Sequence, residues 1–254
     1  MDYGPFGFIE RFEATWAMWI GGGQHFSFMN QPAAAGRNFR QFTRSLEPLL
    51  DPDGQSELRR VAEGYTEVSE QVLGHMWARK LGFPKDGAAF VGEKATALWK
   101  RVEAMMALHP TDFTILFRQL AEVPAAATES DEVLLGLLAP AFYSPLEGNH
   151  LREKWVDWLR AWLAQLAEAH GRDGDGYDAG AVVEQMRRAN PKFIPREWML
   201  AEAYEAAEEG QYGKLRELHE VLQRPYDEQP NYTDRFYRRA PASAFQQGGI
   251  AFMS

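Results

Sequence analysis

The chain has 254 residues, of which 45% are hydrophobic, 13% aromatic and 25% charged, and its formal net charge is −9. A chain of this length can bury one sizeable core, and its excess of acids disfavours a nucleic-acid-binding protein, which would carry a basic stripe. It has no cysteine, which excludes disulfides, cysteinyl metal sites and thiol nucleophiles, and no apolar stretch long enough to predict a membrane span, so we expect a soluble, intracellular, globular protein.

The first motif along the chain is the triplet Asp2-Tyr3-Gly4, which continues as Pro5-Phe6-Gly7-Phe8. Kinase-like folds use an acid–aromatic–glycine triplet to hold a nucleotide-bound magnesium ion: the carboxylate ligates the metal, the ring packs and the glycine permits the turn. A carboxylate suits this role because magnesium takes one or two protein oxygens together with phosphate oxygens and waters. Asp-x-Gly is also ordinary turn chemistry, so the triplet alone leaves both interpretations open.

Strand patterns are confined to the first thirty or so residues, where Gly4 to Phe8 and His25 to Met29 predict short extended segments. Between them, Gly21-Gly22-Gly23 could suggest a phosphate-binding loop. Such a loop needs a following Lys and Ser or Thr, whereas Gln24-His25-Phe26 follow here. We therefore interpret the three glycines as a flexible turn.

Beyond residue 36, apolar side chains recur at three- and four-residue steps, which predicts a mostly helical protein. The predicted helical segments are Leu58 to Met76, stopped by Gly82 and Pro84; Ala95 to Met106; Phe113 to Leu120, capped by Thr111; Val133 to Leu138, capped by Asp131; Leu151 to Leu166; Val182 to Met186; Trp198 to Glu209, opened by Pro195 and closed by Gly210; and Leu215 to Leu222. We expect one mainly α domain with a metal turn and irregular or short-strand segment (1–35), a helical body (36–227) and an extended tail (228–254).

Two further patterns bear on metal binding and on the core. Asp173, Asp175 and Glu184 stand at the first, third and twelfth positions of a calcium loop, but the sixth position, normally glycine, is Asp178, so we favour a solvated acidic linker. None of the six histidines has the spacing of a two-histidine helical metal site. The stripe of Trp155, Trp158 and Trp162 on one predicted helix is expected in the core.

Short motifs with a fixed order extend over nearly the whole chain. Besides the triplet block they are Phe28-Met29-Asn30-Gln31-Pro32, Leu46-Glu47-Pro48-Leu49-Leu50, Lys80-Leu81-Gly82, Asp112-Phe113-Thr114 with Phe117-Arg118, Asn190-Pro191-Lys192-Phe193, Arg196, Pro225-Tyr226 and Phe252-Met253-Ser254. In this set the chain resembles the selenoprotein O family of protein adenylyltransferases, which are kinase-like in fold. It departs from that family at Gly21-Gly22-Gly23, where a polar, aspartate-containing stretch is usual.

The resemblance implies the helical carboxy-terminal lobe of a protein-kinase-like fold, with the amino-terminal nucleotide-binding lobe absent from these residues. It implies transfer of AMP from ATP to hydroxyl groups of protein substrates with magnesium, and it makes Asp2 the metal- and nucleotide-binding residue. No catalytic residue carries over, because the family's second metal ligand and catalytic aspartate would both precede Met1. We therefore expect this chain alone to be inactive. Eukaryotic members of the family are mitochondrial, and otherwise a cytoplasmic location is expected.

Several alternatives remain open at this stage. The chain could be a non-catalytic helical binding module, or the partner of a separately encoded front half, for which an exposed aromatic patch would be the discriminating feature. It could equally be an incomplete gene model in which Met1 is internal. Members of the family can end in a cysteine or selenocysteine, so a redox residue beyond Ser254 and a lineage without that tail are both compatible with the sequence.

Overall fold

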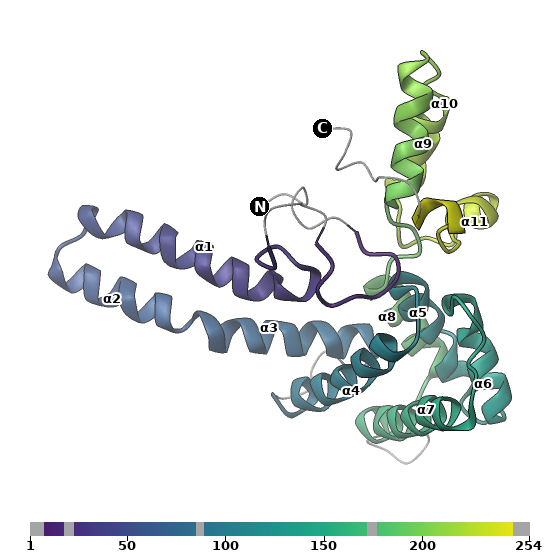
Figure 1. The fold of residues 1–254 in the computed structure, drawn as a ribbon. Coiled ribbons are helices and arrows are strands. Elements are labelled where there is room, and N and C mark those ends of the chain that lie inside the picture. The colour runs from purple at the N-terminus through teal and green to yellow at the C-terminus, as the bar shows by residue number, and fades with distance from the viewer. Residues whose placement is uncertain (1–7, 18–22, 85–88, 172–176, 246–254) are drawn as a thin grey trace.

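The computed structural model describes residues 8–17, 23–84, 89–171 and 177–245. Within these ranges the secondary structure is helical, and β-pairing is limited to two isolated bridges, which confirms the prediction of a mainly α protein. Figure 1 shows three parts: a long helical hairpin on one side, a central body of packed helices, and a short helical arm at the opposite end. No helix in the described part of the chain is both long and apolar enough to cross a membrane.

The hairpin consists of α1 (Gln31–Leu46), which runs antiparallel to α2 (Pro52–Glu63) and α3 (Tyr65–Lys80). The predicted helix from Leu58 to Met76 is therefore two helices, interrupted at Gly64, a residue with low helix propensity. The two sides of the hairpin meet where the Tyr65 hydroxyl donates to the Pro32 carbonyl at 2.9 Å. Gly36 allows this approach, because a Cβ there would lie 2.7 Å from the Tyr65 ring.

The body contains α4 (Ala89–Leu108), α5 (Phe113–Leu120), α6 (Asp131–Leu138), α7 (Asn149–His170) and α8 (Ala179–Ala189). Trp155, Trp158 and Trp162 of α7 are fully buried, as predicted. Two of their indole N–H groups donate to backbone carbonyls, Trp158 to Leu98 at 3.0 Å and Trp162 to Leu81 at 2.9 Å. These bonds satisfy the indole N–H groups of Trp158 and Trp162 inside the core, whereas the buried indole N–H of Trp155 has no hydrogen-bond partner.

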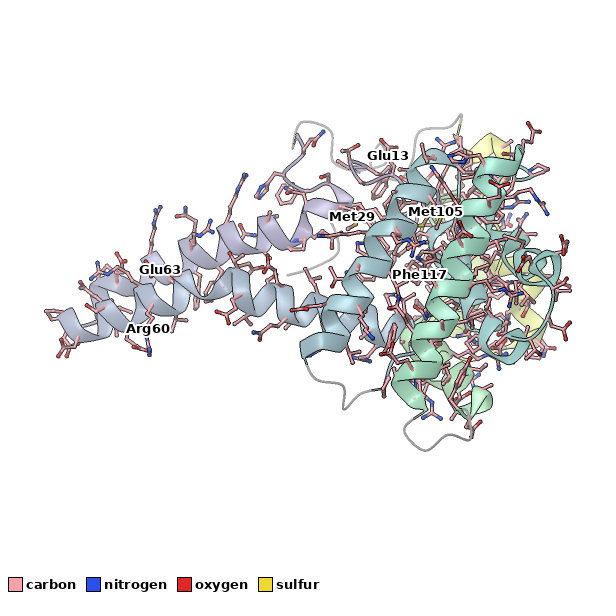
Figure 2. All side chains as sticks on the ribbon, turned by 90° about the horizontal axis from the view of Figure 1, so that it is seen from below. Glu13, Met29, Arg60, Glu63, Met105 and Phe117 are labelled. Atoms are coloured by element: carbon pink, nitrogen blue, oxygen red, sulfur yellow. The ribbon has the colours of Figure 1, made fainter. Side chains whose placement is uncertain are left out.

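The hairpin and the body differ visibly in packing density (Figure 2). Met105 and Phe117 lie among the crowded side chains of the body, whereas Arg60 and Glu63 stand on the projecting hairpin. The inner end of α3 nevertheless belongs to the core. Its Trp77 ring stacks on Trp99 of α4 with centroids 3.7 Å apart.

The arm contains α9 (Glu197–Glu208), α10 (Gly213–Leu222) and α11 (Pro230–Phe236), with its own smaller apolar cluster, which includes Phe193, Met199, Leu218, Val221 and Phe236. Part of the tail predicted to be extended is thus helical. Pro230 opens α11, where its missing N–H costs nothing, and Phe236 buries its ring in the cluster. Five short 3-10 helices complete the described structure: η1 (Phe28–Asn30), η2 (Glu47–Leu49), η3 (Val123–Ala126), η4 (Ala139–Ala141) and η5 (Ala242–Phe245).

Local details differ from the sequence predictions in three places. The strand predicted from His25 to Met29 is wrong, because these residues form a turn that leads into η1. The predicted strand from Gly4 to Phe8 lies outside the described residues except for Phe8 itself. The helix caps are displaced by one residue: Asp112 and Ser130, not the neighbouring Thr111 and Asp131, accept from the backbone N–H three positions ahead.

The third difference concerns the start of α9. Pro195 was predicted in its first turn, but the helix begins at Glu197 with Arg196 as the preceding residue. The Arg196 backbone is extended, and its side chain points into the body instead of along the helix. At the other end the prediction holds, because Gly210 follows α9 with a positive φ of 79°.

Candidate functional site

The residue predicted to bind magnesium, Asp2, lies outside the described residues, as does the rest of its triplet. The described segment that begins at Phe8 is anchored on the body. Phe12 N–H donates to the Thr111 carbonyl at 2.8 Å, and Phe113 N–H donates to the Glu10 carbonyl at 3.0 Å. These bonds hold residues 10–12 against the amino-terminal end of α5.

A buried ion cluster lies at this point. The Arg196 guanidinium, which is 1% exposed, forms two parallel bonds to Asp112, from Nη1 to Oδ2 at 2.7 Å and from Nη2 to Oδ1 at 3.1 Å. Its Nη1 also donates to Glu10 Oε2 at 2.8 Å. Bidentate pairing of this kind is strong and fixes geometry as well as charge. Asp112 thus joins the start of α9 to the start of α5, whose N-cap it also forms.

The electrostatics of this cluster follow from its burial. Burial raises the pKa of the Glu10 carboxyl, and the attraction of Arg196 only partly offsets that effect. Burial also acts to lower the pKa of Arg196, but the nearby carboxylates Asp112 and Glu10 outweigh it and raise that pKa further above its ordinary value. Arg196 is therefore a permanent cation held by two acids, which is the usual condition for burying a charge.

A second set of contacts joins residues 110 positions apart. Lys80 Nζ, at the end of α3, donates to Asn190 Oδ1 at 3.1 Å, and Asn190 Nδ2 returns a bond to the Lys80 carbonyl at 2.9 Å. The ammonium group also lies over the rings of Phe113 and Phe117, at 5.9 and 5.1 Å from their centroids. Burial, assisted by repulsion from Arg79, lowers the pKa of Lys80 to about 8.

A third set of contacts gathers on Glu228. The buried Arg118 donates to its carboxylate and also to the Asn190 and Arg187 carbonyls, at 3.0 and 2.9 Å. Lys192 Nζ donates to Glu228 Oε2 at 2.8 Å and to its carbonyl at 2.7 Å. Burial acts to raise the pKa of Glu228, but the bonds from Lys192 and Arg118 outweigh it, so the net pKa is lowered.

These three sets form one polar junction, which we define as Glu10, Lys80, Asp112, Arg118, Asn190, Lys192, Arg196 and Glu228. It brings together four of the motifs that carry the family resemblance, although they are far apart in the sequence. Its cations Arg118, Lys192 and Arg196 all have carboxylate partners. The junction therefore acts as a clamp between α3, α5, the segment after α8 and the arm, and these three cations are already neutralised within the protein.

The described residues contain no group of three histidine or acidic side chains that could hold a metal ion. A cavity of about 200 Å³ lies beside the junction, between the segment that follows the triplet, α9 and η5. Its lining combines acidic and aromatic side chains: Glu10, Glu13, Glu197, Glu202, Glu205, Trp16 and Trp198. With five acids against the single cation Arg11, this wall favours cationic groups over phosphates.

The other candidate residues have ordinary structural surroundings where the structure describes them. Gly23 has a positive φ of 54° within a turn, while Gly21 and Gly22 lie outside the described residues. Asp173 and Asp175 of the calcium-loop pattern also lie outside them. Of the other two residues in that pattern, Asp178 caps α8 and Glu184 pairs with Arg188 at 3.0 Å.

Sequence reasoning identified most members of the junction as motif residues but assigned them no partners. It missed Glu10 and Glu228 altogether. Both stand close to motifs that were noted, Glu10 two residues after the triplet block and Glu228 two residues after Pro225-Tyr226. The motif residues Arg118, Lys192 and Arg196 are buried bases, and a buried base needs an acidic partner. An acid close to one of the motifs was therefore the signal that the sequence offered.

Comparison with known proteins places the chain in a family. The family model described as "Protein adenylyltransferase SelO" matches residues 1–223. A protein of Azoarcus sp. (strain BH72) called "Protein nucleotidyltransferase YdiU" is 30% identical over all of this chain and 46% of its own length. Its namesake in Aromatoleum aromaticum is 33% identical over all of this chain and 45% of its own length. The chain thus spans less than half the length of these relatives, and it belongs to the SelO family of protein adenylyltransferases.

Proposed function

We propose that this chain is the helical part of a protein nucleotidyltransferase that moves AMP from ATP to hydroxyl groups of protein substrates. In this reaction the hydroxyl oxygen attacks the α-phosphorus, a new P–O bond forms, pyrophosphate leaves and the hydroxyl proton is lost. The observation that carries the proposal is the family match over residues 1–223, which includes Asp2. The relatives bear the name of protein nucleotidyltransferases, which supports ATP and protein substrates here.

The proposal assigns different tasks to different parts of the family's protein. Asp2 would supply one magnesium ligand, and a single carboxylate without bound phosphates does not compete with water for the ion. The described residues supply no metal cluster, and the cavity beside the junction is acidic. We therefore assign nucleotide binding mainly to a kinase-like lobe outside this sequence, treat the chain as a single helical domain equivalent to the carboxy-terminal lobe, and expect no transfer by the chain alone.

The compared relatives are bacterial, so the mitochondrial location of eukaryotic members does not extend to them. This favours the cytoplasmic alternative for the proposed enzyme.

The test uses α-labelled ATP, magnesium and a hydroxyl-bearing acceptor protein. The chain alone should give no labelled acceptor. A chimera in which it replaces the aligned part of the Aromatoleum aromaticum protein should give label that Asp2→Ala abolishes. Asp53→Ala, which removes an acid from the hairpin surface, should leave labelling unchanged and serves as the matched control. Metal-dependent labelling by the chain alone, or chimera labelling that survives Asp2→Ala, would contradict the proposal.

A second candidate function, a non-catalytic binding module, is favoured by one observation. The hairpin carries large apolar side chains that remain exposed, among them Phe42 and Val72. The predicted discriminating feature was an aromatic patch, whereas the exposed side chains of the hairpin are mainly aliphatic and include one aromatic ring, Phe42. A chimera that binds ATP and acceptor yet never transfers label would favour this second function.

A further inference from the structure

The hairpin has an apolar row on its α2–α3 side. Val61, Val68 and Val72 are 50%, 59% and 61% exposed. The two helices follow one another along nearly the same line (Figure 1), so helical geometry can be applied across their junction. At 100° per residue, steps of seven and eleven residues return to within about 20° of the starting direction. The three valines therefore lie along one line of the surface.

α1 contributes to the same side of the hairpin. The contact line between its two halves is marked by Phe39 and Tyr65, whose ring centroids are 5.7 Å apart. Phe42 is three residues after Phe39, and Val68 is three residues after Tyr65, so each is rotated about 60° from the contact line in the same sense. In antiparallel helices, rotations of the same sense lead to the same side. Phe42, which is 59% exposed, thus joins the row.

We define the hairpin face as Phe42, Val61, Val68 and Val72. Two charged residues, Glu57 and Arg79, lie on the same line, eleven residues before Val68 and seven after Val72, and bound the row at its two ends. Other charged residues of the hairpin are rotated at least about 100° from the contact line by the same geometry. They include Arg40 and Arg44 on α1, and Glu67 and Glu70 on α3. The hairpin face is therefore an apolar stretch between one acid and one base, and apolar side chains within a polar rim have the composition of an interface core.

The family comparison indicates what covers this face. In each compared relative the region that aligns with all of this chain is 45% or 46% of the length, so more than as much polypeptide again lies outside the alignment. A second copy is disfavoured because two chains of net charge −9 repel each other. An anionic membrane is disfavoured because the acids Glu63, Glu67 and Glu70 outnumber the bases Arg59 and Arg60 on the polar side of the same helices.

We propose that the hairpin face is the docking surface for the portion of a SelO-family protein that this chain does not contain, which lays the apolar side of a helix along it. Apolar anchors three, four and seven residues apart on that helix would match the spacing of the valines. The identity of the partner rests on the proposed function. Docking itself requires neither ATP nor metal, so binding can be measured without the reaction.

The experiment mixes the full chain with the separately produced portion of the Aromatoleum aromaticum protein that lies outside the aligned region, without nucleotide. Sedimentation velocity should show a one-to-one complex, and biolayer interferometry should give its dissociation constant. Val68→Asp should weaken that complex at least about 10-fold, since a charge in an interface core is left without water. Thr66→Asp adds the same charge to the same helix about 160° away, and it should change the dissociation constant less than about twofold.

Four results would overturn the proposal. They are the absence of any complex, equal weakening by both variants, a dimer of this chain that Val68→Asp dissociates, and binding to phosphatidylglycerol vesicles that Val68→Asp abolishes. Circular dichroism of both variants verifies that the helices persist. A complex that forms as expected but transfers no AMP in the chimera would count against the proposed reaction and not against docking.

Discussion

The hairpin and the body are both built from amphipathic helices, yet they use their apolar faces in opposite ways. In the body, the row Trp155, Trp158 and Trp162 of α7 is completely buried. In the hairpin, the equally regular row Val61, Val68 and Val72 faces solvent. Apolar periodicity therefore identifies a helix and one of its faces, but it does not tell whether the same chain covers that face.

The ion pairs of the two regions differ in burial in the same way as their apolar side chains. Buried cations at the junction are held by buried or half-buried carboxylates, as with Arg196 and Asp112. Ion pairs on the hairpin, such as Arg60 with Glu57, are exposed and local along one helix. Stability should therefore be concentrated in the body and the junction, while the hairpin face should matter for association.

The largest expected effect is in the body. Trp158→Ala should lower the free energy of unfolding by about 3–5 kcal/mol, because it leaves a large cavity in the core. Urea denaturation followed by circular dichroism measures this loss.

Val68→Ala is the matched control on the hairpin face. It should change the free energy of unfolding by at most about 0.5 kcal/mol, as is usual for surface positions. A loss of similar size for both variants would mean that this chain itself covers the hairpin face, and the contrast between the two regions would fail.

A somewhat smaller effect is expected at the junction. Asp112→Asn should cost about 3 kcal/mol, because it removes the bidentate partner of a buried arginine. Asp131→Asn breaks a half-exposed pair with Arg160 and should cost less than about 1 kcal/mol. Urea titration of both variants tests the difference, and equal costs would show that burial at the junction contributes nothing.

The smallest effect depends on pH and concerns Lys80. Its folded pKa of about 8 lies below the ordinary lysine value, so between these two pH values the unfolded chain binds a proton that the folded chain has lost. Stability should therefore rise with pH across this window, by about 2–3 kcal/mol in total. Lys80→Met keeps the contact with the Phe113 and Phe117 rings and should remove this rise.

Comparing denaturation of the parent and Lys80→Met at pH 7.5, 9 and 10.5 isolates this residue from other groups that titrate in the same range. Parallel pH profiles would show that the ammonium group remains well hydrated in the folded protein. In that case the contacts of Lys80 with Asn190 would be a surface interaction.

Much of the fold was predictable because its information is local. The regular spacing of apolar residues predicted α4, α5, α7 and α10, and the tryptophan row of α7 correctly predicted the core. Errors arose where neighbouring residues compete for one role, as with Thr111 and Asp112 for the cap of α5. Helix α11 was missed because its short sequence is helical mainly through the burial of Phe236.

The junction was not predictable from spacing, since its bonds join residues as distant as Lys80 and Asn190. The family resemblance selected most of its members, but not their pairing. Glu10 illustrates the limit: one acid among 36 acquires its role only through contact with Arg196, which is 186 positions away.

Helix α3 passes from one region into the other without a break. Val68 lies on the hairpin face, and Lys80 ends the same helix inside the junction, about 18 Å further along at 1.5 Å per residue. A continuous helix of this length moves as one rigid element. A displacement of the outer end of α3 would therefore be transmitted to the Lys80–Asn190 bond. Because Arg118 donates to the Asn190 carbonyl, the same displacement would also affect the segment that precedes the arm.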